Sequence, residues 1–156
     1  MTAVYRKEYD SLRTILKNDF NVNTGDKEDG ITLLMYAILA ANADSEMVKF
    51  LIQCGADVNI QDRSQKYTAL HFAARDQRED IVKVLLENGA EVNAQDKFGN
   101  TPLSECVTNN SPNLNIVRML LKEGADPNKQ NNYENSAMDT ARKIGNMDLI
   151  NLLKET

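Results

Sequence analysis

The segment that decides the fold runs from Tyr67 to Ala94 and reads YTALHFAARDQREDIVKVLLENGAEVNA. Its first half predicts a short helix, because Thr68 is a favoured capping residue and apolar residues follow it at helical spacing. Its second half carries apolar residues three and four positions apart, which indicates a second amphipathic helix. Gly89 is placed to end this helix in a left-handed turn. The residues expected on the buried sides of the two helices are Leu70, Ala73, Ala74, Ile81, Val82, Leu85 and Leu86.

The same unit recurs along the chain. Its capping residue returns in steps of 36, 33 and 35 residues, and a glycine and an asparagine keep pace with it. The three sets of markers are Thr32, Thr68, Thr101 and Ser136; Gly55, Gly89 and Gly124; and Asn23, Asn59, Asn93 and Asn128. Three landmarks that shift together indicate a true internal repeat.

A period near 33 residues with the Thr-x-Leu-His-x-Ala core of residues 68–73 resembles the ankyrin repeat family. The resemblance covers nearly the whole chain. It implies an all-helical solenoid of stacked helix–turn–helix units with short hairpin fingers, in a single domain. The expected divisions are an N-terminal cap (1–23), three repeats (24–60, 61–94 and 95–129) and a C-terminal cap (130–156).

The repeats depart from the family pattern at defined places. The first repeat has Leu33 where proline is usual and Met35 where histidine is usual. Residues 41–45 and 109–115 each hold two extra residues between the helices, and the finger from Asp62 to Thr68 holds one more than the finger from Asp96 to Thr101. In this last finger, Gly99 supplies the positive φ of a tight turn, and Pro102 occupies the first helical position.

Bulk properties narrow the class of protein. The 156 residues carry a net charge of -5, with 42% hydrophobic and 26% charged residues. This balance argues against direct nucleic-acid binding and favours a neutral or basic protein partner. The longest apolar run spans nine residues, too short to cross a membrane, and residues 1–20 carry charges in place of an apolar signal core. We expect a cytoplasmic monomer in a reducing compartment, with Cys54 and Cys106 unpaired.

A search for catalytic or metal-binding residues finds no complete set. His71 is the only histidine, and the resemblance implies that it ties the repeat turn to the helix start by a hydrogen bond. Cys106 is expected in the core, and Cys54 at the surface near a helix end. The acidic stretches at Glu79–Asp80 and 26–29 lack the ligand spacing of a calcium loop. We therefore expect no catalysis, no metal and no cofactor.

The resemblance also implies a binding surface: the finger tips and the exposed sides of the first helices form a concave face that binds other proteins. Counting from each capping residue gives these candidate partner-binding residues: Arg63, Ser64, Tyr67, Arg75, Asp76, Lys97, Phe98, Asn100, Thr108, Asn109, Asn132, Tyr133 and Lys143. The same count adds Ile31, Leu39 and Ala40 in the first repeat, and Asn135 in the last. Tyr67, Phe98 and Tyr133 stand out, because the fold does not require aromatic residues there and exposed aromatics are frequent binding hot spots. The alternative is that each ring packs on a neighbouring finger and stiffens the row.

These patterns predict a noncatalytic protein-interaction module, a scaffold or an inhibitor. The alternative is an immunity-type inhibitor that neutralises a bacterial toxin, because the extended turns and the ending at 144–146 are similar to small free-standing bacterial ankyrin proteins. An enzyme, an enzyme subunit and a regulator of a nucleic-acid-binding protein are further alternatives, for which the sequence offers no site or motif.

Overall fold

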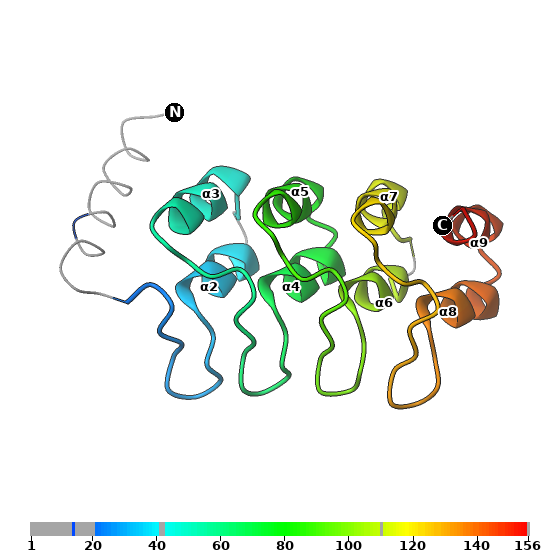
Figure 1. Cartoon of the computed structure of the whole chain (residues 1–156), viewed down its shortest axis with the longest axis horizontal. Coiled ribbons are helices and arrows are strands. Elements are labelled where there is room, and N and C mark those ends of the chain that lie inside the picture. Colours follow the sequence, from blue (N-terminus) through cyan, green and yellow to red (C-terminus); the bar gives the residue numbers. More distant parts are fainter. Residues whose placement is uncertain (1–13, 15–20, 41–42, 110, 156) are drawn as a thin grey trace.

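The computed structural model describes residues 14, 21–40, 43–109 and 111–155. In this part of the chain, helix pairs stack side by side in one row, and a hairpin finger precedes each pair (Figure 1). The pairs are α2 (Leu33–Leu39) with α3 (Ser45–Gln53), α4 (Ala69–Arg75) with α5 (Glu79–Glu87), α6 (Pro102–Val107) with α7 (Leu114–Lys122), and α8 (Ala137–Ile144) with α9 (Met147–Leu153). This arrangement confirms the predicted helical solenoid. The predicted N-terminal cap, 1–23, lies mostly outside the described residues.

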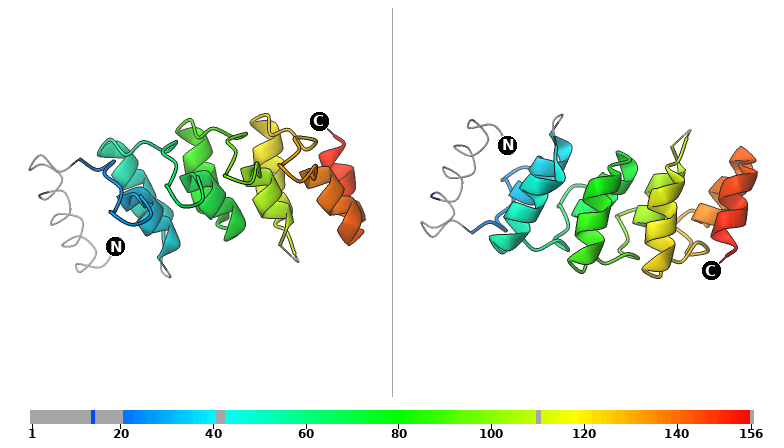
Figure 2. Two further views of the ribbon diagram at one scale, coloured as in Figure 1. Left: turned by 90° about the horizontal axis from the view of Figure 1, so that it is seen from below. Right: turned by 90° about the horizontal axis from the view of Figure 1, so that it is seen from above.

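The helices form two layers. The inner helices α2, α4, α6 and α8 lie between the fingers and the outer helices α3, α5, α7 and α9 (Figure 1). Seen from above, the outer helices run parallel, and seen from below, the fingers cross in front of the inner helices (Figure 2). Each helix packs against its own partner and against its neighbours in the row. The core therefore lies between the layers, and its largest fully buried side chains are Leu34, Met35, Ile38, Leu51, Leu70, Ile81, Leu85, Leu103, Ile116, Leu120, Leu149 and Leu153.

Every inner helix begins at one of the recurrent capping residues. The side-chain oxygen of the cap accepts a hydrogen bond from the backbone N–H three residues further on, which satisfies a donor that the helix start leaves free. The caps are Thr32, Thr68, Thr101 and Ser136. In the third unit Pro102 fills the first turn, as predicted.

The recurrent asparagines bind one repeat to the next. The side-chain amides of Asn23, Asn59 and Asn93 donate to the carbonyls of the glycines one repeat ahead, at 2.8–3.0 Å. Their side-chain oxygens accept from backbone N–H groups two residues beyond those glycines, at 2.8–2.9 Å. The glycine carbonyls are those of Gly55, Gly89 and Gly124, and the N–H groups are those of Asp57, Glu91 and Asp126. This asparagine ladder explains why the glycine and asparagine markers share a period.

The inter-helix turns of the first and third pairs are longer than that of the second, as predicted, and residues 41, 42 and 110 of these turns lie outside the described part. The described residues of these two longer turns contact the short turn of the second pair. Arg78 donates to the carbonyl of Ala43, and the side-chain oxygen of Gln77 accepts from the N–H of Asn113 at 2.6 Å. The finger of the first repeat is as long as that of the second, because Asp26 to Thr32 spans as many residues as Asp62 to Thr68. The extra finger residue is therefore not confined to the second repeat.

Candidate functional site

The fingers and the inner helices lie on the side of the row away from the outer helices, and this side is here called the concave face (Figure 1; Figure 2, left). Residues at equal distances from the caps fall into rows along it, because the repeats stack in register. The predicted partner-binding residues lie on these fingers and inner helices or directly after them. Their local environments differ, and three clusters can be distinguished.

The first cluster is a pair of exposed aromatic rings on adjacent fingers. Phe98 and Tyr133 have ring centroids 6.4 Å apart, and 38% and 65% of their surfaces are exposed. Both residues lie three positions before their caps, which places them at equivalent points of neighbouring fingers. Lys97 holds its ammonium group 5.0 Å from the Phe98 ring centroid. The structure thus brings two of the three predicted aromatics together.

Tyr67 is placed apart from this pair. It directly precedes its cap, so its ring lies against α4: stacked on His71 at 5.2 Å and edge-on to Phe72 at 5.1 Å. The guanidinium of Arg75 lies 5.8 Å from its ring centroid. Burial raises the pKa of the Tyr67 hydroxyl well above its usual value. The Tyr67 side chain is therefore half-buried against α4, whereas the rings of Phe98 and Tyr133 are exposed.

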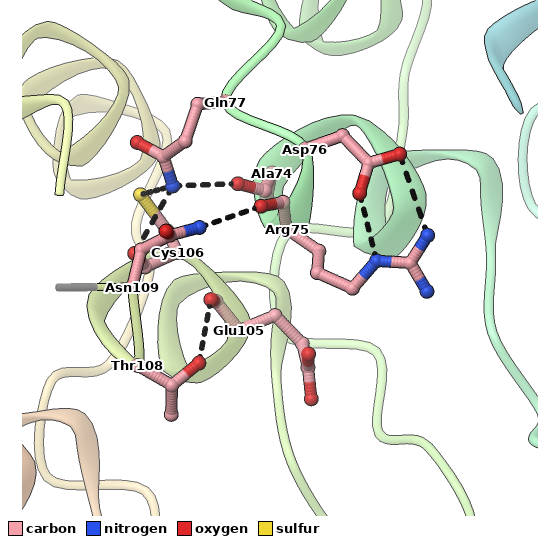
Figure 3. Close-up of polar contacts among 8 residues, drawn as sticks. All are labelled: Ala74, Arg75, Asp76, Gln77, Glu105, Cys106, Thr108 and Asn109. Atoms are coloured by element: carbon pink, nitrogen blue, oxygen red, sulfur yellow. Dashed lines mark hydrogen bonds and ion pairs between the residues drawn. The ribbon is translucent and has the colours of Figure 1, made fainter. Parts of the chain in front are cut away.

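The second cluster joins the C-terminal ends of α4 and α6 (Figure 3). Arg75 donates to both carboxylate oxygens of Asp76, at 2.8 and 3.3 Å, and the side-chain amide of Asn109 donates to the Arg75 carbonyl at 2.9 Å. Thr108 donates to the carbonyl of Glu105 at 2.9 Å. Four predicted residues, Arg75, Asp76, Thr108 and Asn109, are therefore gathered at one place.

Glu105 belongs to this cluster but was not predicted from the sequence. It lies on α6 one helical turn before Thr108 and is half-buried. Burial raises the pKa of its carboxyl group above the usual value. The sequence held a signal for it: the positions equivalent to Glu105, four residues after each cap, carry the uncharged residues Tyr36, Phe72 and Thr140.

The third cluster consists of polar residues that fasten neighbouring fingers. Arg63 donates its backbone N–H to the Asp29 carbonyl and its guanidinium to the Asp26 carbonyl. Lys97 donates its ammonium group to the Ser64 carbonyl at 2.9 Å. Two further predicted residues complete these ties: the side chain of Asn132 donates to the Lys97 carbonyl, and the side-chain oxygen of Asn100 accepts from Asn131. These candidates hold the fingers together, whatever else they contact.

The two ends of the concave face carry different polar contacts. At the first repeat, Ile31 and Ala40 are partly buried, and Leu39 is joined by Tyr36 as an exposed apolar side chain. The Tyr36 hydroxyl donates to Asp26 at 2.8 Å. At the last repeat, Lys143 donates to the side-chain oxygen of Asn135. Exposed apolar side chains thus occur at both ends, Tyr36 and Leu39 on α2 and Ile144 on α8.

His71 has the tying role that was predicted. The backbone N–H of Thr68 donates to Nδ1 at 3.1 Å, so Nδ1 carries no proton and Nε2 donates to the Asn100 carbonyl at 3.2 Å. Burial lowers the pKa of the ring, which favours this neutral form. The tie reaches further than expected, because Asn100 belongs to the next finger.

The described residues show no group of three or more potential metal ligands and no helix long and apolar enough to span a membrane. Both cysteines are free, and burial raises the pKa of the Cys106 thiol to about 11, which makes it a poor nucleophile. Cys106 lies in the core and Cys54 at the end of α3, as expected.

Two hollows lie on the opposite side of the molecule, between the outer helices. One, of about 400 Å³, lies between α5 and α7, and the other, of about 380 Å³, lies between α7 and α9. Their linings mix charges of both signs with apolar side chains that are buried or partly buried: Glu79, Lys83, Leu86, Glu87, Met119, Lys122 and Glu123 in the first, and Arg118, Leu121, Lys122, Leu152 and Glu155 in the second. Neither has the exposed aromatic rings of the concave face.

Comparison with known proteins bears on the whole chain. A family model described as ankyrin repeats, in three copies, matches residues 1–96, 34–133 and 88–156, which together span the sequence. Among curated proteins, none matches the chain significantly.

Proposed function

Since this chain belongs to the ankyrin repeat family, we propose that it is a noncatalytic module that binds a protein partner through its concave face and finger tips. The observation that carries this proposal is the exposed pair of Phe98 and Tyr133 on adjacent fingers. Ankyrin repeats generally serve protein–protein interaction, and the exposed pair supports the proposal that a partner binds at these fingers.

Large aromatic side chains supply much of the binding free energy of protein interfaces when a partner covers them. Phe98 and Tyr133 are held by fingers that backbone hydrogen bonds join, because the N–H of Asn132 donates to the Phe98 carbonyl at 2.8 Å. The fingers therefore present the two rings at a fixed spacing, which reduces the ordering cost of binding.

The partner that suits this face is neutral or basic, because the chain carries a net charge of -5. We place the interaction in the reducing cytoplasm and expect the module to act as a monomer. Scaffold and inhibitor are both compatible with this proposal.

The immunity-type alternative is a narrower form of the same proposal, in which the partner is a bacterial toxin with a basic site. The acidic charge and the extended turns after α2 and α6 support it. It predicts that a gene for such a toxin lies beside the gene for this chain. Co-expression of the chain should then restore growth to cells that produce the toxin, and continued growth arrest would refute this form.

The proposal is tested by a double variant, Phe98→Ala with Tyr133→Ala, in a pull-down from source-cell lysate read by mass spectrometry. Met147→Ala is the matched control, because this side chain is 61% exposed but lies at the start of outer helix α9. Circular dichroism checks that each variant is folded. We expect one protein to be retained by the wild type and by the control and lost by the double variant. Equal retention by all three would refute binding at the aromatic pair.

A further inference from the structure

We propose that Glu105 binds a cationic side chain, a lysine or an arginine, that the protein partner inserts into the concave face beside α4 and α6. This inference rests on the proposed function, because it names the chemistry of the partner at the same face. It starts from the carboxylate of Glu105, which is half-buried and makes none of the ion pairs found among the described residues.

The surroundings of Glu105 offer neutral donors. The Tyr67 hydroxyl and the Asn100 side chain lie near the carboxylate and partly offset the rise that burial causes in its pKa. Among the described residues, none of the four ion pairs involves Glu105. In Figure 3 no dashed line from the residues drawn reaches its carboxylate.

The nearest cation is already engaged. Arg75 makes two hydrogen bonds with Asp76 and lies over the rings of Tyr67 and Phe72, at 5.8 and 5.2 Å from their centroids. Arg75 therefore compensates Asp76 more fully than Glu105.

The carboxylate of Asp96 adds negative charge near Glu105. Asp96 is buried, and its oxygens accept from the N–H groups of Phe98 and Asn100 and from the Asn100 side chain, all neutral donors. Within the described part of the chain, Arg75 is the cation whose charge lowers the pKa of Glu105, and it already pairs with Asp76, whereas the charge of Asp96 raises that pKa. The centre of the concave face carries a local negative charge that an incoming cation would neutralise.

Burial explains why such a cation would be bound. The raised pKa of Glu105 shows that its ionised form is poorly solvated in this site. A cation from outside would restore the lost stabilisation, and attraction between charges is stronger where water is partly excluded. The aliphatic stem of the partner's lysine or arginine would pack along the half-buried ring of Tyr67.

The competing explanation is that Glu105 only positions Tyr67 and Asn100. The two explanations differ in the effect of Glu105→Gln, because glutamine keeps the size and can still accept hydrogen bonds but loses the charge. A positioning role predicts little change in cation binding, whereas direct recognition predicts its loss.

The test titrates the isotope-labelled full chain with N-acetyl-arginine amide and follows backbone amide signals by NMR at pH 7. The matched neutral probe is N-acetyl-citrulline amide, which keeps the shape but has no charge. We expect the arginine probe alone to shift the signals of Tyr67, Glu105 and their neighbours. Glu105→Gln should weaken this binding about tenfold or more, while Glu123→Gln, an exposed acid at the end of outer helix α7, should leave it unchanged.

Three outcomes would overturn the inference: equal shifts with the citrulline probe, equal binding by Glu105→Gln, or no shift at these residues up to the solubility limit of the arginine probe. Failure of the inference can be told apart from failure of the proposed function. A partner lost by the Phe98 and Tyr133 double variant but retained by Glu105→Gln would leave the proposed function standing and refute this inference alone.

Acidification gives an independent readout. Because the pKa of Glu105 is raised, the arginine probe should be released at a higher pH than from an ordinary exposed carboxylate. The other charged or titratable groups near Glu105 are Tyr67, Arg75, Asp76 and Asp96, and the comparison with Glu105→Gln separates the contribution of Glu105 from theirs. Glu105→Gln should therefore remove the high-pH part of this release, and an unchanged profile would refute the inference.

Discussion

Thr32 and Thr68 cap the inner helices α2 and α4 in the same way, yet Met35 and His71, three residues further on, differ in what they reach. The Met35 sulfur accepts only the Thr32 N–H, at 3.5 Å, within its own repeat. His71 accepts from Thr68 and also donates to Asn100 of the next finger. Both junctions are also fastened from the later finger, by Arg63 to Asp26 and Asp29 at the first and by Lys97 to Ser64 at the second. The comparison teaches that a histidine three residues after the cap adds a forward tie to a junction that the later finger already fastens.

The largest expected effect comes from making the second repeat resemble the first. His71→Met should lower the free energy of unfolding by about 2 kcal/mol, because it removes the bond to Asn100 and weakens the bonds to Thr68. Urea unfolding followed by circular dichroism measures this loss. A loss below about 0.5 kcal/mol would show that the histidine tie is not what distinguishes the junctions.

The same variant should change the pH dependence of stability. Burial holds the pKa of His71 below its usual value of 6.5, so the unfolded chain binds this proton first as the pH falls. The stability contributed by neutral His71 is complete above about pH 6.5 and is lost as the pH falls towards the lowered pKa of the folded protein. Wild type should therefore lose more stability than His71→Met between pH 7.5 and 5.5, and parallel curves would contradict this.

Three asparagine variants test the asparagine ladder, which the two junctions share. Asn59→Ala removes two bonds of the asparagine ladder at the first junction and should cost about 1.5 kcal/mol. Asn93→Ala should cost the same at the next junction, because its bonds match. Asn128→Ala is the control, since the structure shows no cross-repeat bond from this side chain in the part it describes. Thermal unfolding of the three variants makes the comparison.

Making the first repeat resemble the second should change the stability less. Met35→His places a ring nitrogen near the Tyr67 carbonyl, which occupies the position that the Asn100 carbonyl occupies for His71. We expect a gain of about 1 kcal/mol from this new hydrogen bond, visible as slower hydrogen exchange in α2. A loss of stability would show that the first junction has no room for the ring.

The smallest effect concerns the fingers. Lys66 has φ 58°, at the point where the first and third fingers use Gly30 and Gly99. Lys66→Gly should raise stability by about 0.5 kcal/mol, because relief of the left-handed strain outweighs the greater freedom of glycine in the unfolded chain. The melting temperature measures it, and a decrease would mean that the lysine stem contributes contacts that offset its strain.

Sequence reasoning succeeded where structure depends on a few adjacent residues. Thr68, Gly99 and Pro102 act through their own backbone geometry, so their roles as cap, turn and first helical residue could be predicted. The tie from His71 to its helix start was available from the family resemblance. The asparagine ladder was visible only as a period, because its bonds join residues one repeat apart.

The candidate site was less predictable, because side-chain environments on the concave face depend on neighbouring repeats. Counting from the caps found Phe98 and Tyr133 but could not show that Tyr67 packs on His71 and Phe72. It also passed over Glu105, whose half-burial arises from the finger and helix beside it. A comparison of equivalent positions across repeats would have singled out this charge.

The asparagine ladder has a consequence for how such a chain can change over generations. Each rung joins a residue to its counterpart one repeat ahead, so the bonding instructions are carried within every repeat. A gene that duplicated residues 61–94 in frame would copy the Gly89 acceptor and the Asn93 donor together, and the new repeat would join both neighbours with bonds that already exist. The number of repeats can therefore drift by duplication and deletion while the fold is inherited unchanged.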